Sequence, residues 1–328
     1  MFTNYLFLML SGFFLTCFSM FLLRKLALKY NFLISKNIPL IGGLAMGFSF
    51  LSICLLVFYI NGRLSSEIIG ILAASFIMLI FGIIDDWREL SVATKFIVQI
   101  ICVFVLILFG ITTQIIYIGK ISNIIITFLW VIGITNAFNH LDITDGLAAG
   151  TAVIVSITFL TVAFLNGDIN SSILFLTLGT VVLGFLIYNL LPAKIYMGNS
   201  GSHFLGFAIA ATAILISYAP LEKKVALFSP VLILWFPIFD TAFLMLMRIK
   251  QGKSAFRKSD DHLGSRFLKK GYSKNKTLIL MLLLCLFFSF CGIVVSQVSS
   301  KFGVGIIALV LLSSVYVSIK MNKVSVNG

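Results

Sequence analysis

Residues 136–147 combine polar side chains in a way that suggests chemistry; they read Asn-Ala-Phe-Asn-His-Leu-Asp-Ile-Thr-Asp-Gly-Leu, with an uncharged apolar run on each side. If the stretch is helical, Asn139, Asp142 and Asp145 are three residues apart and share one face. One amide and two carboxylates form an oxygen-rich set that suits a hard cation such as Mg²⁺. The alternative is a helix cap followed by a solvated loop, since Asn and Asp favour such places. Polar groups this dense between membrane-grade runs favour a functional role.

A second polar group consists of two adjacent carboxylates, Asp85 and Asp86, which follow an apolar run at residues 67–84. Two carboxylates this close at a membrane edge repel one another, so they suit a cation site or a general base. The alternative is a basic loop that happens to contain acids, with Arg88 neutralising one of them.

Two further segments could bind phosphate. Residues 192–203 are rich in Gly and Ser, and backbone amides near Gly198 at the start of a helix would form a phosphate cradle, although a plain turn is the alternative. Residues 248–276 form a long loop with ten Lys and Arg residues, which suit a pyrophosphate or an anionic lipid surface. A bare charge at Asp240, inside an apolar run, is costly, so Asp240 should pair with a basic group or face the site.

The elements that must position these groups are membrane helices. The chain has 328 residues, of which 60% are hydrophobic and 11% charged, with a mean hydropathy of +1.12. Such a composition indicates an all-α integral membrane protein, here a single domain over residues 1–328 that contains the loop at 248–276. We expect about eleven transmembrane helices, at 3–23, 40–60, 67–84, 96–110, 114–135, 147–165, 172–191, 203–218, 226–247, 277–297 and 302–319.

The distribution of charge predicts the orientation. If the loops alternate sides, 19 of the 24 Lys and Arg residues fall on one side. The positive-inside rule makes that side cytoplasmic, with the N-terminus outside and the C-terminus inside. We therefore expect a multi-pass protein of the inner (plasma) membrane with its polar site on the cytoplasmic face, and the net charge of +13 needs no nucleic-acid partner. The five cysteines lie in apolar runs without a CxxC pair, which indicates neither disulfides nor zinc.

Taken together, these residues resemble the polyprenyl-phosphate N-acetylhexosamine-1-phosphate transferases, integral membrane enzymes that move a sugar-1-phosphate from a UDP-sugar onto a lipid phosphate. The similarity extends in order along nearly the whole chain. The motifs that carry it are Pro39–Gly43, Gly82–Asp86, Lys95 with Gln99, Asn136–Gly146, Met197–Ser202, Phe239–Thr241 and Asp261–Leu263.

The resemblance implies a Mg²⁺-dependent enzyme, with Mn²⁺ as an alternative ion. Undecaprenyl or another polyprenyl phosphate would attack the β-phosphorus of a UDP-sugar and release UMP, as the first step of a cell-envelope glycan pathway. The resemblance also allows a homodimer. The implied roles are catalysis by Asp85, Asp86, Asp142 and Asp145, metal binding by Asn139 and Asn199, and substrate binding by Lys95, Asn136, Gly198, Ser200, Arg257, His262 and Arg266.

Two departures from the family pattern affect the prediction. Asn199 stands where the family has Asp, and His262 stands alone where the family has a histidine cluster. The missing cluster favours UDP-GlcNAc or a related N-acetylhexosamine over UDP-MurNAc-pentapeptide. Both departures leave a non-catalytic lipid-phosphate-binding member as the main alternative. A secondary transporter is disfavoured, because the polar groups gather at one membrane face and no repeat is visible.

Overall fold

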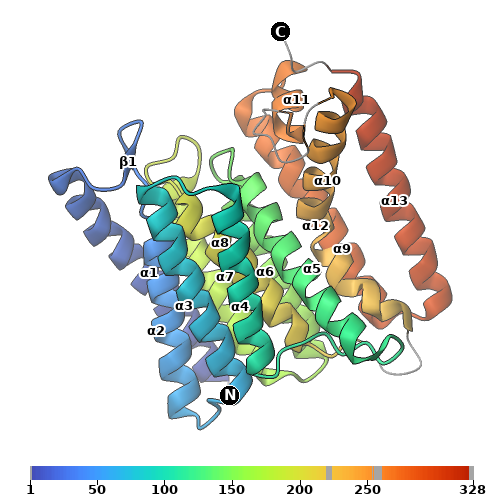
Figure 1. Ribbon diagram of the computed structural model, residues 1–328, viewed down its shortest axis with the longest axis horizontal. Helices are drawn as coiled ribbons and strands as arrows, with labels where there is room; N and C mark the ends of the chain where they lie inside the picture. Colours follow the sequence, from blue (N-terminus) through green and yellow to red (C-terminus); the bar gives the residue numbers. More distant parts are fainter. Residues whose placement is uncertain (1, 219–223, 253, 255–260, 325–328) are drawn as a thin grey trace. The chain divides into compact units, whose positions relative to one another are not determined.

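The computed structural model describes residues 2–218, 224–252, 254 and 261–324, which divide into two compact units, Met1–Ser217 and Tyr218–Gly328 (Figure 1). Each unit is described by itself.

The first unit is a helical bundle with a short hairpin. Its eight helices follow one another in sequence with short connections, and α8 packs against α2, α3, α5, α6 and α7 (Figure 1). Nearly every residue of α8 from Gly198 to Ala213 is buried, which explains why this helix is rich in Gly, Ala and Ser: small side chains let neighbouring helices approach closely. The helices are α1 (Phe2–Tyr30), α2 (Gly42–Ile60), α3 (Ser66–Trp87), α4 (Val92–Leu108), α5 (Gly119–Leu141), α6 (Leu147–Leu165), α7 (Ile169–Asn189) and α8 (Gly198–Leu215).

The hairpin between α1 and α2 helps to place the start of α8. Strands β1 (Ile34–Ser35) and β2 (Ile38–Pro39) pair antiparallel, and Lys36 and Asn37 between them both have positive φ, as a tight two-residue hairpin turn requires. The chain after β2 then pairs with the segment before α8. Tyr196 donates its backbone N–H to Pro39, and Gly42 donates to Tyr196 in return.

The second unit contains a bent helix where the sequence predicted one continuous span at 226–247. The segment Lys224–Ile233 meets α10 (Trp235–Lys250) at 68°. Pro237 explains the bend, because it has no N–H for the carbonyl of Ile233, and that carbonyl accepts a hydrogen bond from Ser289 Oγ instead, at 3.1 Å. The other elements are η1 (Lys224–Phe228), α9 (Ser229–Ile233), α11 (Leu263–Lys269), α12 (Lys274–Gln297) and α13 (Ser300–Asn322).

The helices confirm a polytopic membrane protein. Within the described residues, eight helices are long and apolar enough to cross a membrane, or nine if the bent pair is one span. The predicted spans 96–110 and 203–218 correspond to α4 and α8, which do not reach that standard, so the number eleven stays a prediction. The predicted loop at 248–276 is partly helical, because it contains α11.

Candidate active site

Asp85, at the end of α3, forms a buried ion pair. Its Oδ2 lies 2.5 Å from Lys95 Nζ, and its Oδ1 accepts the backbone N–H of Leu90 at 2.8 Å. Ser91 caps α4 by accepting the backbone N–H of Thr94, and this cap sets the first turn from which Lys95 extends. The side chain of Asp85 is fully buried, so Lys95 neutralises a charge that would otherwise be costly there.

Asp86 reaches across to the start of α8. Its two carboxylate oxygens accept the backbone N–H groups of Asn199 at 2.6 Å and Ser200 at 3.0 Å. Gly198 has a φ of +73°, and a Cβ on it would lie 2.6 Å from Asp86 Oδ2, which is why glycine is needed there. The predicted phosphate cradle at these amides is therefore already filled by a carboxylate, and a phosphate would have to displace Asp86 to use them.

Asn139 faces the first turns of α8 with its amide nitrogen. Nδ2 donates to Asn199 Oδ1 at 3.2 Å and to Ser202 Oγ at 2.9 Å. Both amide hydrogens are thus directed to α8. The amide oxygen of Asn139 makes no hydrogen bond within the part of the chain that the structure describes, so this oxygen is the one offered to a ligand.

Asp142 and Asp145 do not continue the helical face of Asn139, contrary to the sequence prediction. Helix α5 ends at Leu141, Asp142 is its C-cap, and Gly146 turns the chain with a φ of +79°. Asp145 Oδ2 accepts the backbone N–H of Ala193 at 3.0 Å. The two carboxylates therefore sit in a tight connection to α6, outside the regular helix.

The connection to α6 is held by Asn189, a residue the sequence analysis did not single out. Its Oδ1 accepts the N–H of Gly146 at 2.9 Å, and its Nδ2 donates to the carbonyl of Ile195 at 3.0 Å. Asn189 thereby ties the segment around Asp145 to the segment that leads into α8. The sequence offered one signal for this role: Asn189 is a lone amide at the end of the apolar run that corresponds to α7.

The carboxylates repel one another electrostatically. Burial raises the pKa of Asp142 to about 7, and the negative charges of Asp86 and Asp145 contribute further to the increase. A cation near Asp142 would relieve this repulsion.

Asn136 pairs with a neighbouring amide. Asn136 Nδ2 donates to Gln99 Oε1 at 2.8 Å, and Gln99 Nε2 donates back to Asn136 Oδ1 at 3.3 Å. The reciprocal pair joins α4 to α5. Gln99 lies one helical turn after Lys95, and Asn136 lies one turn before Asn139. The substrate contact predicted for Asn136 stays a prediction.

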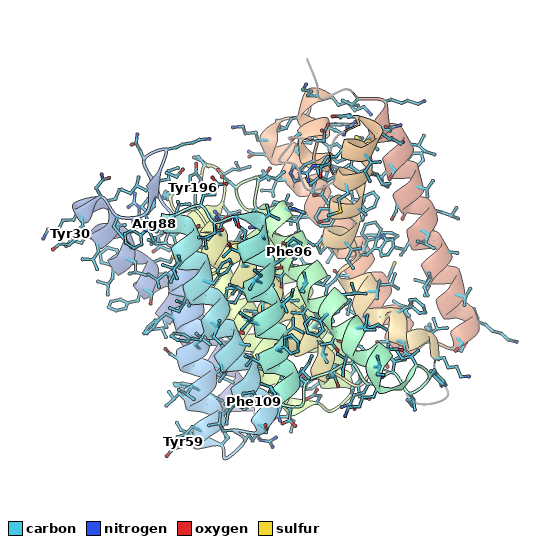
Figure 2. All side chains as sticks on the ribbon, in the orientation of Figure 1. Tyr30, Tyr59, Arg88, Phe96, Phe109 and Tyr196 are labelled. Carbon is cyan, nitrogen blue, oxygen red and sulfur yellow. The ribbon has the colours of Figure 1, made fainter. Side chains whose placement is uncertain are left out.

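All of these groups lie at one end of the first unit. Arg88 and Tyr196, which flank them in sequence, are at the same end in Figure 2, whereas Tyr59 and Phe109 lie at the opposite end. The sequence prediction that the polar motifs meet at one end of the bundle is confirmed for Asp85, Asp86, Lys95, Asn139 and Asn199 by their shared hydrogen bonds.

The second unit holds the late motifs. Asp240 is buried in α10, where its Oδ1 accepts the N–H of Leu263 at 3.2 Å and its Oδ2 lies 3.6 Å from His262 Nδ1. His262 is thus a basic group beside Asp240, as one of the two predicted alternatives requires, although Asp240 Oδ2 and His262 Nδ1 form no hydrogen bond. Predicted Arg257 lies outside the described residues.

Arg266 is buried and has internal partners. It donates to Asp261 Oδ1 at 3.2 Å and to the carbonyls of Met321 and Val324 at 3.1 and 2.6 Å. In this arrangement Arg266 fastens the end of α13 to α11, and its predicted phosphate contact, like that of His262, stays a prediction.

Comparison with known proteins identifies the family. The sequence model of glycosyl transferase family 4 matches residues 68–217. A probable undecaprenyl-phosphate N-acetylglucosaminyl 1-phosphate transferase of Bacillus subtilis (strain 168) is 33% identical over 290 residues, covering 84% of this chain and 78% of that protein. The chain belongs to glycosyl transferase family 4.

Other relatives of this family 4 glycosyl transferase are named for different substrates. A decaprenyl-phosphate N-acetylglucosaminephosphotransferase of Mycobacterium leprae (strain TN) is 31% identical over 279 residues, covering 75% of this chain and 70% of that protein. A phospho-N-acetylmuramoyl-pentapeptide-transferase of Wolbachia sp. subsp. Drosophila simulans (strain wRi) is 30% identical over 284 residues, covering 77% and 82%. The family match includes every candidate residue of the first unit, from Asp85 to Ser200.

The site of this family 4 glycosyl transferase has donors that fit Mg²⁺. Within the described residues, no three His, Cys, Asp or Glu side chains are grouped as a metal site by themselves. Any such set would therefore need other oxygen donors, and Asn139 Oδ1 is available for that purpose. Carboxylate and amide oxygens together are the hard donors that Mg²⁺ prefers.

Proposed function

We propose that this membrane enzyme transfers GlcNAc 1-phosphate, or a closely related N-acetylhexosamine 1-phosphate, from a UDP-sugar to polyprenyl phosphate. The products are polyprenyl-diphospho-sugar and UMP. The observation that carries the proposal is the carboxylate and amide cluster of α3, α5 and α8, in a chain 33% identical to a protein named for this reaction. The single histidine of the late motif favours GlcNAc over MurNAc-pentapeptide as the sugar.

The reaction forms one P–O bond and breaks another. An oxygen of the lipid phosphate attacks the β-phosphorus of the UDP-sugar, and the bond between that phosphorus and UMP breaks. A phosphate monoester is mostly ionised at neutral pH, because its second pKa is about 6. Proton removal is therefore a small part of the task, and holding the two phosphates in line is the larger part.

Lys95 is the cation suited to the lipid phosphate. Asp85 holds its ammonium group from one side, which leaves the other N–H bonds of Lys95 for phosphate oxygens. Asp85 then acts by orienting Lys95, and Asp86 acts by fixing the start of α8. This division of roles follows from their different partners, which the sequence could not distinguish.

We propose Mg²⁺ as the cofactor, with Mn²⁺ as a substitute. Asn139 and Asn199 would hold it, with Asp86 and Asp142 as the nearby carboxylates. When bound, the ion neutralises charge on the pyrophosphate and on the departing UMP. Asn199 contributes no negative charge, so we expect the ion to bind more weakly than it would at an aspartate.

The proposed location is the inner (plasma) membrane, with the site on the cytoplasmic face. The support is the excess of Lys and Arg on the side that includes Arg88 and Lys95. UDP-sugars in the cytoplasm would then reach the site directly.

The test is transfer of radiolabelled sugar phosphate from UDP-GlcNAc to undecaprenyl phosphate by the purified protein, with Mg²⁺, Mn²⁺ or EDTA. We expect lipid product with either metal and none with EDTA. Asp85→Asn and Asp145→Asn should each abolish turnover while the protein still inserts into the membrane.

Asp168→Asn is the matched control. Asp168 caps α7 by accepting the N–H of Ser171 at 3.0 Å, and asparagine caps helices about as well, so this variant should keep its activity. Full turnover by Asp85→Asn would contradict the proposal. Absence of product from every UDP-N-acetylhexosamine, together with turnover restored by Asn199→Asp, would instead identify a member that binds substrate without processing it.

A further inference from the structure

His203 is a buried histidine in the second turn of α8 to which nothing above assigns a role. The residue has no exposed surface, although it lies in a helix otherwise lined by small and apolar side chains. An ionisable side chain in such an interior is expensive to keep, which makes a functional role the first hypothesis.

The contacts of His203 determine which ring nitrogen carries the hydrogen. Nδ1 lies 2.9 Å from the backbone carbonyl oxygen of Asn199. A carbonyl oxygen can only accept, so Nδ1 must be the N–H and Nε2 must hold the lone pair. Nε2 is buried and has no hydrogen-bond partner among the described residues. The ring also packs in a T-shaped arrangement with the ring of Phe81 from α3, with centroids 5.9 Å apart and planes at 89°.

His203 also lies beside the amide of Asn139. Its Nδ1 is 3.5 Å from Asn139 Nδ2, whose two hydrogens are directed to Asn199 Oδ1 and Ser202 Oγ. Three side chains of the first two turns of α8 thus surround the amide nitrogen of Asn139: those of Asn199, Ser202 and His203. Their combined effect is to turn the amide oxygen of Asn139 away from these groups.

We propose that His203 is a positioning residue. Its Nδ1–H binds the backbone carbonyl of Asn199 and so fixes the first turn of α8. Asn199 in turn holds the side-chain amide of Asn139 in the orientation that the metal site needs. This inference rests on the proposed function, since it assigns a role within the same site. It differs from a packing role because it depends on one N–H group at one position of the side chain. A group that supports metal ligands in this way typically changes metal affinity 10- to 100-fold when it is removed, so an effect of about 10-fold or more is expected.

Three substitutions distinguish a positioning role, which depends on the Nδ1–H group, from a packing role, which depends on the volume of the ring. His203→Leu removes the N–H but fills much of the same space. His203→Asn places an amide N–H near the position of Nδ1, and His203→Gln places it near the position of Nε2. Thr212→Val is the control, because Thr212 is buried in the same helix and its hydroxyl has no partner in the described part of the chain.

The measurement is Mn²⁺ binding to the purified full chain in the presence of UDP, followed by electron paramagnetic resonance. We expect His203→Leu and His203→Gln to raise the Mn²⁺ dissociation constant by about 10-fold or more, whereas His203→Asn and Thr212→Val remain close to the unsubstituted protein. In transfer assays the first two should need correspondingly more Mg²⁺ for half-maximal rate.

Two results would overturn the proposal: unchanged Mn²⁺ affinity in His203→Leu, or an equal loss in His203→Asn and His203→Leu. If His203→Leu does not fold, His203→Gln takes its place in the comparison: Mn²⁺ affinity that is equal in His203→Gln and His203→Asn would overturn the proposal. Absence of Mn²⁺ binding by the unsubstituted protein also overturns it. A protein that binds Mn²⁺ with the expected variant pattern, yet transfers no sugar phosphate, would instead contradict the proposed function and leave the positioning role intact.

Discussion

At the scale of single residues, the two adjacent aspartates have different partners and therefore different roles. Asp85 is neutralised by Lys95, whereas Asp86 accepts two backbone N–H groups at the start of α8. Both arrangements stabilise a charge that the surrounding helices exclude from water. The difference arises from which way each side chain points at the end of α3, and the sequence carries no information about that direction beyond the order of the two residues.

The ion pair makes a testable prediction about stability. Lys95→Met leaves the Asp85 carboxylate buried without its cation. Breaking a buried pair in this way costs 3–5 kcal/mol, and because Lys95 is partly exposed we expect about 3 kcal/mol. The double variant Asp85→Asn with Lys95→Met should recover most of this loss, because no unpaired charge remains. Unfolding of the purified proteins in detergent measures both effects, and a double variant as unstable as Lys95→Met would contradict the explanation.

Asp142 makes a prediction about pH. Its pKa is about 7 in the folded protein, against about 3.9 in an unfolded chain. The folded state therefore binds more protons between these values, and the contribution of Asp142 to stability falls as the pH rises from about 4 to about 7. Asp142→Asn removes this loss. At pH 8 in EDTA we expect its melting temperature to be higher by about 2–4 °C, which corresponds to about 1 kcal/mol, because Asp142 is only half-buried and solvent screens part of its charge.

At pH 4 both side chains are largely neutral, so the melting temperatures of Asp142→Asn and the unsubstituted protein should nearly coincide. A difference of the same size at both pH values would show that the substitution acts through packing and not through charge.

At the scale of helices, the site depends on how closely α2 and α3 approach α8. A Cβ on Gly82 would lie 2.3 Å from Ser200 Cα, and one on Gly43 would lie 2.1 Å from the backbone nitrogen of Gly201. The neighbouring atoms are backbone atoms that cannot turn aside. These two glycines therefore set the distance over which Asp86 can reach the amides of α8.

Gly82→Ala should consequently destabilise the protein and disturb the site. Overpacking of this kind costs about 1–3 kcal/mol, and we expect a loss of transfer activity as well because α8 must shift. Gly133→Ala in α5 is the control: a Cβ there meets nothing within 4 Å, so activity should be retained and stability unchanged or slightly raised. Thermal unfolding and the transfer assay test both variants. Equal behaviour of the two would contradict close packing at Gly82.

The helices could be predicted from the sequence to different degrees. Runs such as 147–165 match α6 because both ends carry strong signals, Gly146 at the start and Asn166 at the end. The start of α8 was placed at 203 in place of 198, because its first turn is polar, and its contacts with the distant residues Asp86 and Asn139 cannot be read from the sequence. The bend near Pro237 was missed, although a proline inside an apolar run was a visible signal.

The residues of the candidate site could also be predicted only in part from the sequence. Residue types and order were sufficient to select Asp86, Asn139 and Asn199, which hydrogen bonds link together with Ser200, and the neighbouring Asp85, which pairs with Lys95. They were not sufficient to place Asp145, because the helical spacing ends at Leu141 and the position of Asp145 depends on Ala193 and Asn189, which are far along the chain. Pairings between distant segments follow from tertiary packing, which local pattern does not contain.

At the scale of the whole molecule, the remaining prediction concerns orientation in the membrane. Of the 24 Lys and Arg residues, 19 fall on the side that holds the site if the predicted spans alternate. The positive-inside rule then places Arg88 and Lys194 in the cytoplasm, and Arg63 and Lys120 outside. Alternation depends on every predicted span crossing, including the shorter α4 and α8, so orientation also tests the predicted number of spans.

Single cysteines at these four exposed positions can be labelled with a membrane-impermeant maleimide. The five native cysteines are buried or half-buried in helices, so their background labelling should be low. In intact cells we expect Arg63→Cys and Lys120→Cys to react, and Arg88→Cys and Lys194→Cys to react only after the membrane is permeabilised. The opposite pattern would place the carboxylate and amide cluster outside, away from cytoplasmic UDP-sugars, and would contradict the proposed reaction. Labelling of Lys120→Cys on the same side as Arg88→Cys would show that α4 does not cross between them, which would reduce the number of spans but leave the site where it is.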